Sequence, residues 1–430
     1  MKDKHLIVVS VDAMVGEDLR TLAELPHVGK LLREGSLVRS VRTIYPALTH
    51  PIHASLMSGC AANGTGIPNN EEFIPGELCP PWYNRMDQMR CETIFHAAHR
   101  AGLTTCACRW PVTAGGFDVI DYLVPEVMDA DAAAQPDREA LYRSICSPAI
   151  FEDIVRPNLP KLDGPKHPSD EHFSIACACD ILRKYRPNLL MTHPCMVDST
   201  RHGNGLFGPA VTRALELTDQ WIGQLMDAVE EAGIAGTTSF AIVSDHGHME
   251  IKRNLNLNVF LRDRGFIQVD DQERLADWTA LSKSCDLSAQ IYVRDKSRLD
   301  EVGRALREMC DEGIYGISEV LTAQEAESRY GLAGDFSFVV ESDGFTCFTD
   351  DWRRPAVQII EPEVYEHRFS THGHMPEKGP QPPMIVCGPA FRRGVTLERG
   401  SILDEAPTFA AALGLTLPQA QGKPMDDLLA

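Results

Sequence analysis

Carboxylate and imidazole side chains recur in close pairs along this chain. Asp198 and His202 stand four residues apart, which places both on one face of a helical turn. Asp245 and His246 are adjacent, and a further pair of histidines begins at His372. Carboxylate oxygens and imidazole nitrogens are ligands of zinc and manganese. The groups together therefore predict a metal centre.

Asp12 and Thr49 are two further candidates for this centre. Asp12 follows the apolar run Leu6–Val11, and Thr49 stands two residues before Pro51, which suits the first turn of a helix. A threonine in that position can simply cap the helix. Alternatively, the helix amides attract an anion there, and metal coordination turns the hydroxyl into a nucleophile. The spacing alone leaves both interpretations open.

Short apolar runs before these residues predict the strands of one sheet. They are bounded by turns and separated by helical patterns, as in a doubly wound, parallel α/β sheet. The runs are Leu6–Val11, Leu189–Thr192, Phe240–Val243 and Met384–Cys387. The clearest helix begins near Pro209 and ends near Gly233. In open α/β sheets ligands bind beyond the carboxyl ends of the strands, where Asp12, Asp198 and Asp245 fall.

The stretch from about 255 to 345 has a different pattern. It combines the apolar run Ile291–Val293, a helix pattern over Leu299–Cys310 and the run Phe336–Val340. Few candidate catalytic residues fall in it. We therefore expect an inserted, smaller α+β subdomain, with the parent sheet resuming before His372.

These patterns divide the chain into two parts. Residues 1–255 and 345–430 are expected to form the α/β core, and residues 256–344 the inserted cap subdomain. Segments 68–90 and 112–170 are rich in Pro, Gly and Asp, so we expect long loops or cap elements near the site.

Composition restricts the partners. The chain has 430 residues, 43% of them hydrophobic, and a net charge of −20, which indicates a globular protein without a basic nucleic-acid surface. No run approaches the ~18 apolar residues that span a bilayer. The N-terminal apolar run is too short for a signal peptide. We expect a cytoplasmic protein with its thirteen cysteines reduced, no membrane and no stable nucleic-acid partner, in an unknown oligomeric state.

The order of the chemical groups resembles a known family. Asp12, Thr49, Asp198-x-x-x-His202, Asp245-His246 and His372-Gly373 are ordered as in the alkaline phosphatase superfamily. More narrowly, they resemble the type I phosphodiesterase/nucleotide pyrophosphatase family. Thr49–His53 is similar to that family's nucleophile segment, typically Thr-Phe-Pro-Asn-His. The match continues in Ser55–Gly59, Gly66–Asn70, Trp110-Pro111 and Gly388–Phe391. It covers the core and not the insertion.

The resemblance implies a mostly parallel sheet of the alkaline phosphatase type and two divalent metal ions. These are Zn²⁺, with Mn²⁺ as the alternative. One ion would be held by Asp12, Thr49, Asp245 and His246, and the other by Asp198, His202 and His372. Two cations about 4 Å apart can clamp the attacking and leaving oxygens of a displacement.

The resemblance also implies the reaction. Thr49 would attack phosphorus and form a phospho-threonine intermediate, so that phosphodiester or phosphoanhydride bonds of small molecules and nucleotides are hydrolysed. Asn70 stands where the family places an asparagine that bonds a phosphoryl oxygen, and Asn69 is the alternative if the loop register differs by one.

Arg201 departs from the family, which has glycine before the second-site histidine. This arginine is either a solvated side chain or a contact to phosphate or carboxylate. The competing function is therefore a phosphomonoesterase or a phosphonate (phosphonoacetate-like) hydrolase using the same site. The extra substrate charge would need cations, for which Arg201, Arg109 and Arg368 are candidates.

Three further protein classes fit the sequence less well. A sulfatase would need a convertible Cys or Ser, and a metal-independent mutase would not need this ligand set. A non-catalytic binding protein would take up metal without turnover.

His248 and His374 are candidates for either supporting roles or direct contacts. Trp82, Tyr83 and Trp110 could stack on a base or pack in the core.

Overall fold

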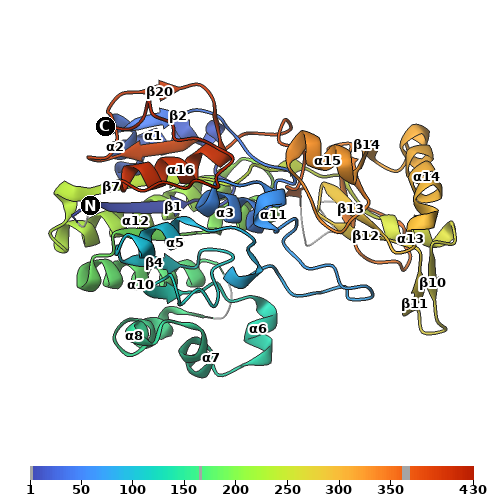
Figure 1. The fold of residues 1–430 in the computed structure, drawn as a ribbon, viewed down its shortest axis with the longest axis horizontal. Coiled ribbons are helices and arrows are strands. Elements are labelled where there is room, and N and C mark those ends of the chain that lie inside the picture. Colours follow the sequence, from blue (N-terminus) through green and yellow to red (C-terminus); the bar gives the residue numbers. More distant parts are fainter. Residues whose placement is uncertain (1–2, 164–166, 361–368) are drawn as a thin grey trace.

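An eight-stranded sheet forms the centre of the larger lobe (Figure 1). The computed structural model describes residues 3–163, 167–360 and 369–430, and the side chains of residues 129–131 are not described. The strands, in order across the sheet, are β20 (Thr396–Leu397), β2 (Ser36–Val38), β19 (Met384–Cys387), β7 (Thr238–Val243), β1 (His5–Ser10), β6 (Leu189–Thr192), β4 (Thr105–Cys108) and β5 (Tyr122–Val124). Because β7, β1, β6, β4 and β5 are parallel neighbours, the predicted doubly wound, mostly parallel α/β fold is confirmed.

The direction of one strand differs from the prediction. Met384–Cys387 forms β19, which is antiparallel to both β7 and β2. The chain enters β19 after Gln381, whose carbonyl accepts a hydrogen bond from the Gly16 amide beyond the end of β1. It therefore starts at the carboxyl edge and must run back. A continuous apolar run indicates burial on both faces, but it carries no information about direction.

The central sheet also resumes later than predicted. Among the described residues between 345 and His372, the strands β16 (Thr346–Thr349), β17 (Val357–Ile359) and β18 (Ser370–Thr371) belong to smaller sheets, and β18 pairs with the short strand β8 (Met249–Glu250). The central sheet itself continues at β19, after His372. Residues 370–381, which include His372, thus lie at the carboxyl edge of the sheet before the chain re-enters the core.

Helices cover both faces of the sheet, which explains why the strands are apolar throughout. Leu6 and Val8 of β1 pack with α3 (Thr49–Ser58), α5 (Ile94–Arg100) and α16 (Ile402–Ala412) on one face. Ile7 and Val9 point to the other face, toward α2 (Pro26–Glu34), α10 (Ser169–Tyr185) and α12 (Pro209–Glu231). Helix α12 matches the prediction, since it begins at Pro209 and ends before Gly233.

The two Pro-, Gly- and Asp-rich segments differ from each other. Segment 68–90 is largely irregular, with one short helical turn, η2 (Met86–Gln88). Segment 112–170 is more ordered than predicted, because it contains the edge strand β5 and several short helices. These are α6 (Asp129–Ala134), α7 (Arg138–Ile145), α8 (Pro148–Ile150) and α9 (Arg156–Asn158). Elements this short leave no clear periodicity.

The smaller lobe is built on an antiparallel sheet. Its strand order is β12 (Ala280–Ser284), β13 (Ser288–Val293), β15 (Phe338–Ser342) and β14 (Ile317–Thr322). Helices α13 (Leu257–Asp263), α14 (Leu299–Glu312) and α15 (Ala323–Tyr330) belong to this lobe, as does the hairpin β10–β11 (Ile267–Val269, Leu275–Trp278). A second sheet joins β16 (Thr346–Thr349), β9 (Arg253–Asn256) and β17 (Val357–Ile359). The boundaries 256–344 stay a prediction.

The two lobes are connected by buried contacts. The Tyr45 hydroxyl donates to Glu341 Oε2 at 2.9 Å, and Ser288 Oγ donates to the Gly373 carbonyl at 2.7 Å. An apolar cluster that includes Tyr45, Phe336 and Met375 also spans both lobes. The smaller lobe therefore contacts the segment that carries His372.

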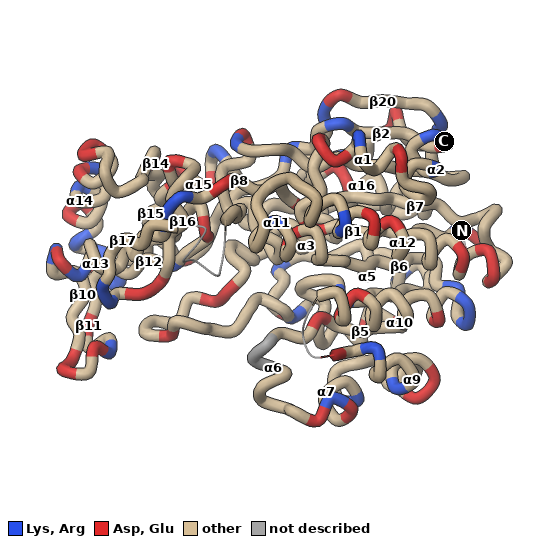
Figure 2. Tube along the Cα trace, turned by 180° about the vertical axis from the view of Figure 1, so that it is seen from behind, with Lys and Arg blue, Asp and Glu red and all other residues tan. Residues whose placement is uncertain are grey.

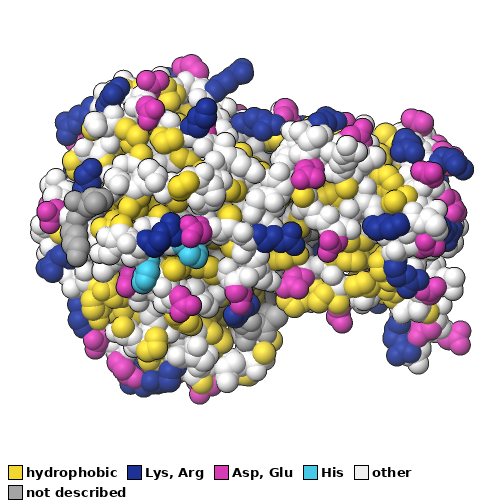
Figure 3. All heavy atoms as spheres, viewed as in Figure 1, with side chains coloured by type: hydrophobic (Ala, Val, Ile, Leu, Met, Phe, Trp, Pro, Cys, Tyr) yellow, Lys and Arg dark blue, Asp and Glu magenta, His cyan; other side chains and the backbone are white. Residues whose placement is uncertain are grey.

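Basic and acidic residues are both distributed along the chain in both lobes (Figure 2). On the face shown in Figure 3, apolar and charged side chains are interspersed, and the molecule narrows between the lobes.

Candidate active site

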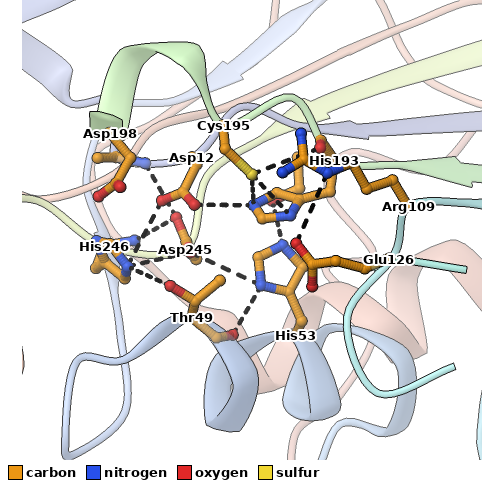
Figure 4. Close-up of polar contacts among 12 residues, drawn as sticks. Asp12, Thr49, His53, Arg109, Glu126, His193, Cys195, Asp198, Asp245 and His246 are labelled. Carbon is orange, nitrogen blue, oxygen red and sulfur yellow. Dashed lines mark hydrogen bonds and ion pairs between the residues drawn. The ribbon is translucent and has the colours of Figure 1, made fainter. Parts of the chain in front are cut away.

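The parallel strands β1 and β7 bring Asp12 and Asp245 together. Ser10 is in register with Val243, so the residues that follow each strand meet at one edge of the sheet. Asp245 Oδ1 accepts hydrogen bonds from the backbone amides of Ala13 at 3.1 Å and His246 at 3.0 Å. The other oxygen, Oδ2, lies 3.2 Å from His246 Nε2, which is also 3.6 Å from Asp12 Oδ1 (Figure 4).

Thr49 faces this group from the start of helix α3. It is the first residue of the helix and not its cap, because Leu48 occupies the N-cap position without a side-chain hydrogen bond. Its hydroxyl lies 3.3 Å from His246 Nε2. The Thr49 side chain is thus directed at the carboxylate–imidazole group, at a helix N-terminus whose dipole favours an anion.

Asp198 and His202 form a second group on α11 (Met196–Asn204), the helix that follows β6. His202 Nε2 lies 3.4 Å from Asp198 Oδ2, and His372 Nε2 lies 3.8 Å from Asp198 Oδ1. The Nδ1 atoms of both histidines bond backbone carbonyls, His202 to Ser370 at 2.8 Å and His372 to Ala47 at 2.9 Å. These bonds turn both Nε2 atoms toward Asp198, as in metal sites with oriented histidine ligands.

His248 belongs to the second group, whereas His374 does not. His248 Nε2 lies 2.7 Å from Asp198 Oδ1, and the ligand atoms of Asp198, His246, His248 and His372 lie within 4.8 Å of one another. His374 Nδ1 instead bonds the Met375 carbonyl at 2.9 Å. Burial lowers the pKa of His374 to about 4, so its imidazole is neutral.

One oxygen of each of the buried carboxylates Asp12 and Asp245 lacks a hydrogen-bond donor among the described residues, which is the observation that fits a metal. Asp12 Oδ1 and Asp245 Oδ2 are buried, and neither has a hydrogen-bond partner in the described part of the chain. Buried carboxylates are normally paired or coordinate metals. The group around Asp12 and Asp245 therefore fits a divalent cation, and the ligand atoms gathered around Asp198 also lie close enough together to hold a metal ion.

The pKa shifts follow from the same crowding. Burial and the Asp198 charge raise the pKa of Asp245 to about 7, and burial with the charges of Asp198 and Asp245 raises that of Asp12. Burial opposes ionisation of Asp198 as well, but His202, His248 and His372 hold its pKa well below the ordinary value. A cation beside Asp12 and Asp245 would favour their ionised forms.

A cleft of about 910 Å³ opens in front of both groups and is lined by both lobes. The core supplies Thr49, Asn70 and Trp82. The smaller lobe supplies Lys283, which donates to Asp350 Oδ2 at 2.6 Å and also bonds Glu71. Among the three aromatic candidates, Trp82 lines the cleft, whereas Trp110 is buried and packs edge-on against His53.

Asn70 and Asn69 have different surroundings. Asn70 Oδ1 accepts a hydrogen bond from the His50 amide at 2.9 Å, so its amino group is the end that can donate to a ligand. Asn69 is buried, and its amino group donates to the Ser284 carbonyl of the smaller lobe at 3.0 Å. Of the two, Asn70 therefore suits a substrate contact beside Thr49.

The structure places two of the three candidate arginines, Arg201 and Arg109, in ion pairs. Arg201 is buried, donating to Asp18 Oδ2 at 2.5 Å and to the Ala13 carbonyl at 3.1 Å, so it is neither solvated nor aimed into the cleft. Arg109 pairs with Glu171 at 3.2 Å and Asp170 at 3.4 Å. Arg368 lies outside the described residues.

His193 was not among the sequence candidates. It directly follows β6, and its Nε2 lies 3.0 Å from Asp12 Oδ2. Its position after a buried strand resembles that of Asp12 after β1, so the sequence held a usable indication.

Lys283 was also missed by the sequence analysis, because no pattern around it distinguishes an ion-paired cleft residue from a surface lysine.

The fold and these groups define an α/β protein with paired carboxylate–histidine groups at the carboxyl edge of its sheet. Residues 6–366 match the Type I phosphodiesterase / nucleotide pyrophosphatase family, and the chain belongs to it. Within the described ranges, the helices are all too short or too polar to cross a bilayer.

Comparisons with individual proteins agree with this family. Over 278 residues the chain is 26% identical to human and 24% to mouse ectonucleotide pyrophosphatase/phosphodiesterase family member 1, covering 61% of this chain. It spans 26% of the length of these relatives. The murine ectonucleotide pyrophosphatase/phosphodiesterase 5 structure aligns with 99% of this chain and 100% of its own, at a TM-score of 0.68 and 21% identity. This similarity confirms the fold.

Proposed function

We propose that this chain is a metal-dependent phosphodiesterase or nucleotide pyrophosphatase with Thr49 as its nucleophile. The observation that carries the proposal is the position of the Thr49 hydroxyl. It lies at a helix N-terminus, 3.3 Å from His246 Nε2, beside two buried carboxylate oxygens that lack donors. Family membership supports the same reaction class.

The ligands divide into two groups. Asp12, Thr49, Asp245 and His246 would hold one divalent ion, and Asp198, His202 and His372 the other, with His248 beside them. Zn²⁺ suits this donor set, and Mn²⁺ is the alternative. The ions would supply Lewis-acid stabilisation and lower the pKa of bound hydroxyl groups.

The protein's own residues account for the remaining steps. The Thr49 oxygen attacks phosphorus, the bond from phosphorus to the leaving oxygen breaks, and the alcohol or phosphate departs with a proton. The Asn70 amino group would hold a phosphoryl oxygen, and the N-terminus of α3 favours the negative charge of the phosphoryl group. Water then cleaves the phospho-threonine and regenerates the Thr49 hydroxyl.

The substrate is expected to be a small phosphodiester or a nucleotide. A structural neighbour, an inactive threonine-to-alanine variant of murine ectonucleotide pyrophosphatase/phosphodiesterase 5, is in complex with AMP. Trp82 lines the cleft and offers a surface for a base or aryl group. Because Arg201 and Arg109 are engaged in ion pairs, the added cations that a monoester would require are not supplied by them.

The test compares bis-p-nitrophenyl phosphate with p-nitrophenyl phosphate. Wild-type protein and Thr49→Ala are each stripped with a chelator and then restored with zinc or manganese. We expect faster diester turnover that requires metal and falls about a thousandfold or more in Thr49→Ala. Monoester preference would favour the phosphatase or phosphonate alternative. Undiminished activity in Thr49→Ala would refute the nucleophile assignment.

A further inference from the structure

His193 is a buried imidazole that the proposed reaction does not use. It follows β6, and the parallel pairing of β1 with β6 brings it beside Asp12, which follows β1. A backbone hydrogen bond from the Asp12 amide to the Pro194 carbonyl, at 3.1 Å, joins the two segments. The side chain of His193 is 1% exposed, so its partners are protein groups.

The two oxygens of Asp12 have different surroundings. Oδ2 lies 3.0 Å from His193 Nε2, whereas Oδ1 faces His246 and has no hydrogen-bond partner among the described residues (Figure 4). A neutral imidazole carries one N–H. A bond to an ionised carboxylate places that hydrogen on Nε2.

The His193 ring is held in place from two sides. The Cys195 thiol lies 3.4 Å from His193 Nδ1, and the ring of His53 lies against it with a centroid separation of 4.0 Å. The Cys195 amide donates to Glu171 Oε1 at 3.1 Å, and Glu171 also pairs with Arg109. The segment that carries His193 is thereby tied to helix α10.

We propose that His193 is a positioning residue for the metal centre: its Nε2–H holds Asp12 Oδ2, so that Oδ1 is presented to the cation beside Thr49. The inference rests on the proposed function, because it assumes a cation at Asp12. Replacing a residue that hydrogen-bonds a metal-ligating carboxylate commonly lowers metal affinity about 10- to 100-fold.

A third cation among Asp12, His193 and Cys195 is the competing interpretation, since their potential ligand atoms lie within 4.8 Å of one another. The geometry argues against it, because these groups already bond one another: His193 Nε2 lies 3.0 Å from Asp12 Oδ2, and the Cys195 thiol lies 3.4 Å from His193 Nδ1. The structure thus favours a hydrogen bond over a further ion.

The experiment measures zinc binding by metal-stripped protein in competition with a chromogenic chelator, together with the metal content at saturation. The variants are His193→Ala, and His193→Gln, whose amide can donate as Nε2–H does. His5→Ala is the matched control, because His5 is also a buried histidine joining these segments, bonding the Pro187 carbonyl at 2.9 Å near the opposite end of β1.

We expect the zinc affinity of His193→Ala to fall about 10- to 100-fold. That of His193→Gln should stay within about threefold of wild type, and His5→Ala should match wild type. Unchanged affinity in His193→Ala would overturn the proposal. So would a loss of one bound ion per chain in both His193→Ala and Cys195→Ala, which would establish the third site. If His193→Ala does not fold, His193→Asn, which is too short to reach Asp12, replaces it. Wild type that takes up no metal would instead overturn the proposed function.

Discussion

The His372 side chain is hydrogen-bonded through Nδ1 to the carbonyl of Ala47, at 2.9 Å, two residues before Thr49. The Gly373 amide bonds the same carbonyl at 2.7 Å. A proposed ligand of the second group is thereby fixed to the segment that carries Thr49, the proposed nucleophile. The distance between the two groups is set by this contact and not by spacing along the chain.

Gly373 is therefore expected to be intolerant of a side chain. Its φ is +86°, and a Cβ would lie 1.8 Å from the Cys285 carbonyl oxygen. Gly102 is the control, because its φ is +67° and a Cβ there would meet nothing within 4 Å. We expect Gly102→Ala to cost about 1 kcal/mol, and Gly373→Ala about 1–3 kcal/mol more, with weaker zinc binding. Urea unfolding measures the stability of both variants. Equal losses of stability in Gly102→Ala and Gly373→Ala would contradict the prediction that position 373 has no room for a side chain.

Asn70→Asp separates the structural from the catalytic use of this side chain. The carboxylate can still accept the His50 amide hydrogen, so stability should change little. The amino donor is lost and a negative charge is added beside the phosphate. We expect kcat/KM for a diester to fall about a hundredfold, with an unchanged melting temperature. Unaltered kcat/KM would exclude Asn70 from substrate binding.

Arg201 is expected to act through stability. Arg201→Met leaves Asp18 buried without its partner, which costs about 3–5 kcal/mol. The double variant Arg201→Met/Asp18→Leu removes both charges and should recover much of this loss. Denaturant titration gives the stabilities, and steady-state kinetics the KM. A tenfold rise in KM with little loss of stability would instead indicate a substrate contact.

His374 gives a pH dependence with a defined sign. Burial lowers its pKa to about 4, below the ordinary 6.5. Between pH 4 and pH 6.5 the His374 imidazole binds a proton in the unfolded chain but not in the folded chain. The free energy of unfolding therefore decreases as the pH falls from 6.5 toward 4.

The corresponding measurement compares wild type with His374→Gln in urea at pH 6.5 and pH 5, both in chelator. Wild type should lose up to about 2 kcal/mol more than the variant over this interval. Parallel pH dependence in the two proteins would show that His374 titrates normally.

Much of the site was predictable from local order. Asp12 and Asp245 each follow a buried strand, and parallel strands end at one edge of a sheet. The pairs Asp198–His202 and Asp245–His246 are encoded by their spacing. The family resemblance extended these groups to Thr49, Asn70 and His372. The domain boundaries, the cytoplasmic location and the roles of the individual site residues stay predictions.

Only the tertiary structure decided the remaining features, because they depend on contacts between distant segments. The direction of β19 follows from where the chain leaves the site, and an apolar run contains no direction. Arg201 is buried against Asp18, which is 183 residues away in the chain. The departure from the family motif at this position therefore did not indicate whether the side chain is exposed or buried. Long-range packing brings His193 beside its partner Asp12. It also places Lys283 in the cleft. The sequence alone indicated most of the chemical groups that meet at the sheet edge, His193 excepted, whereas long-range packing determined which atoms of those groups face one another.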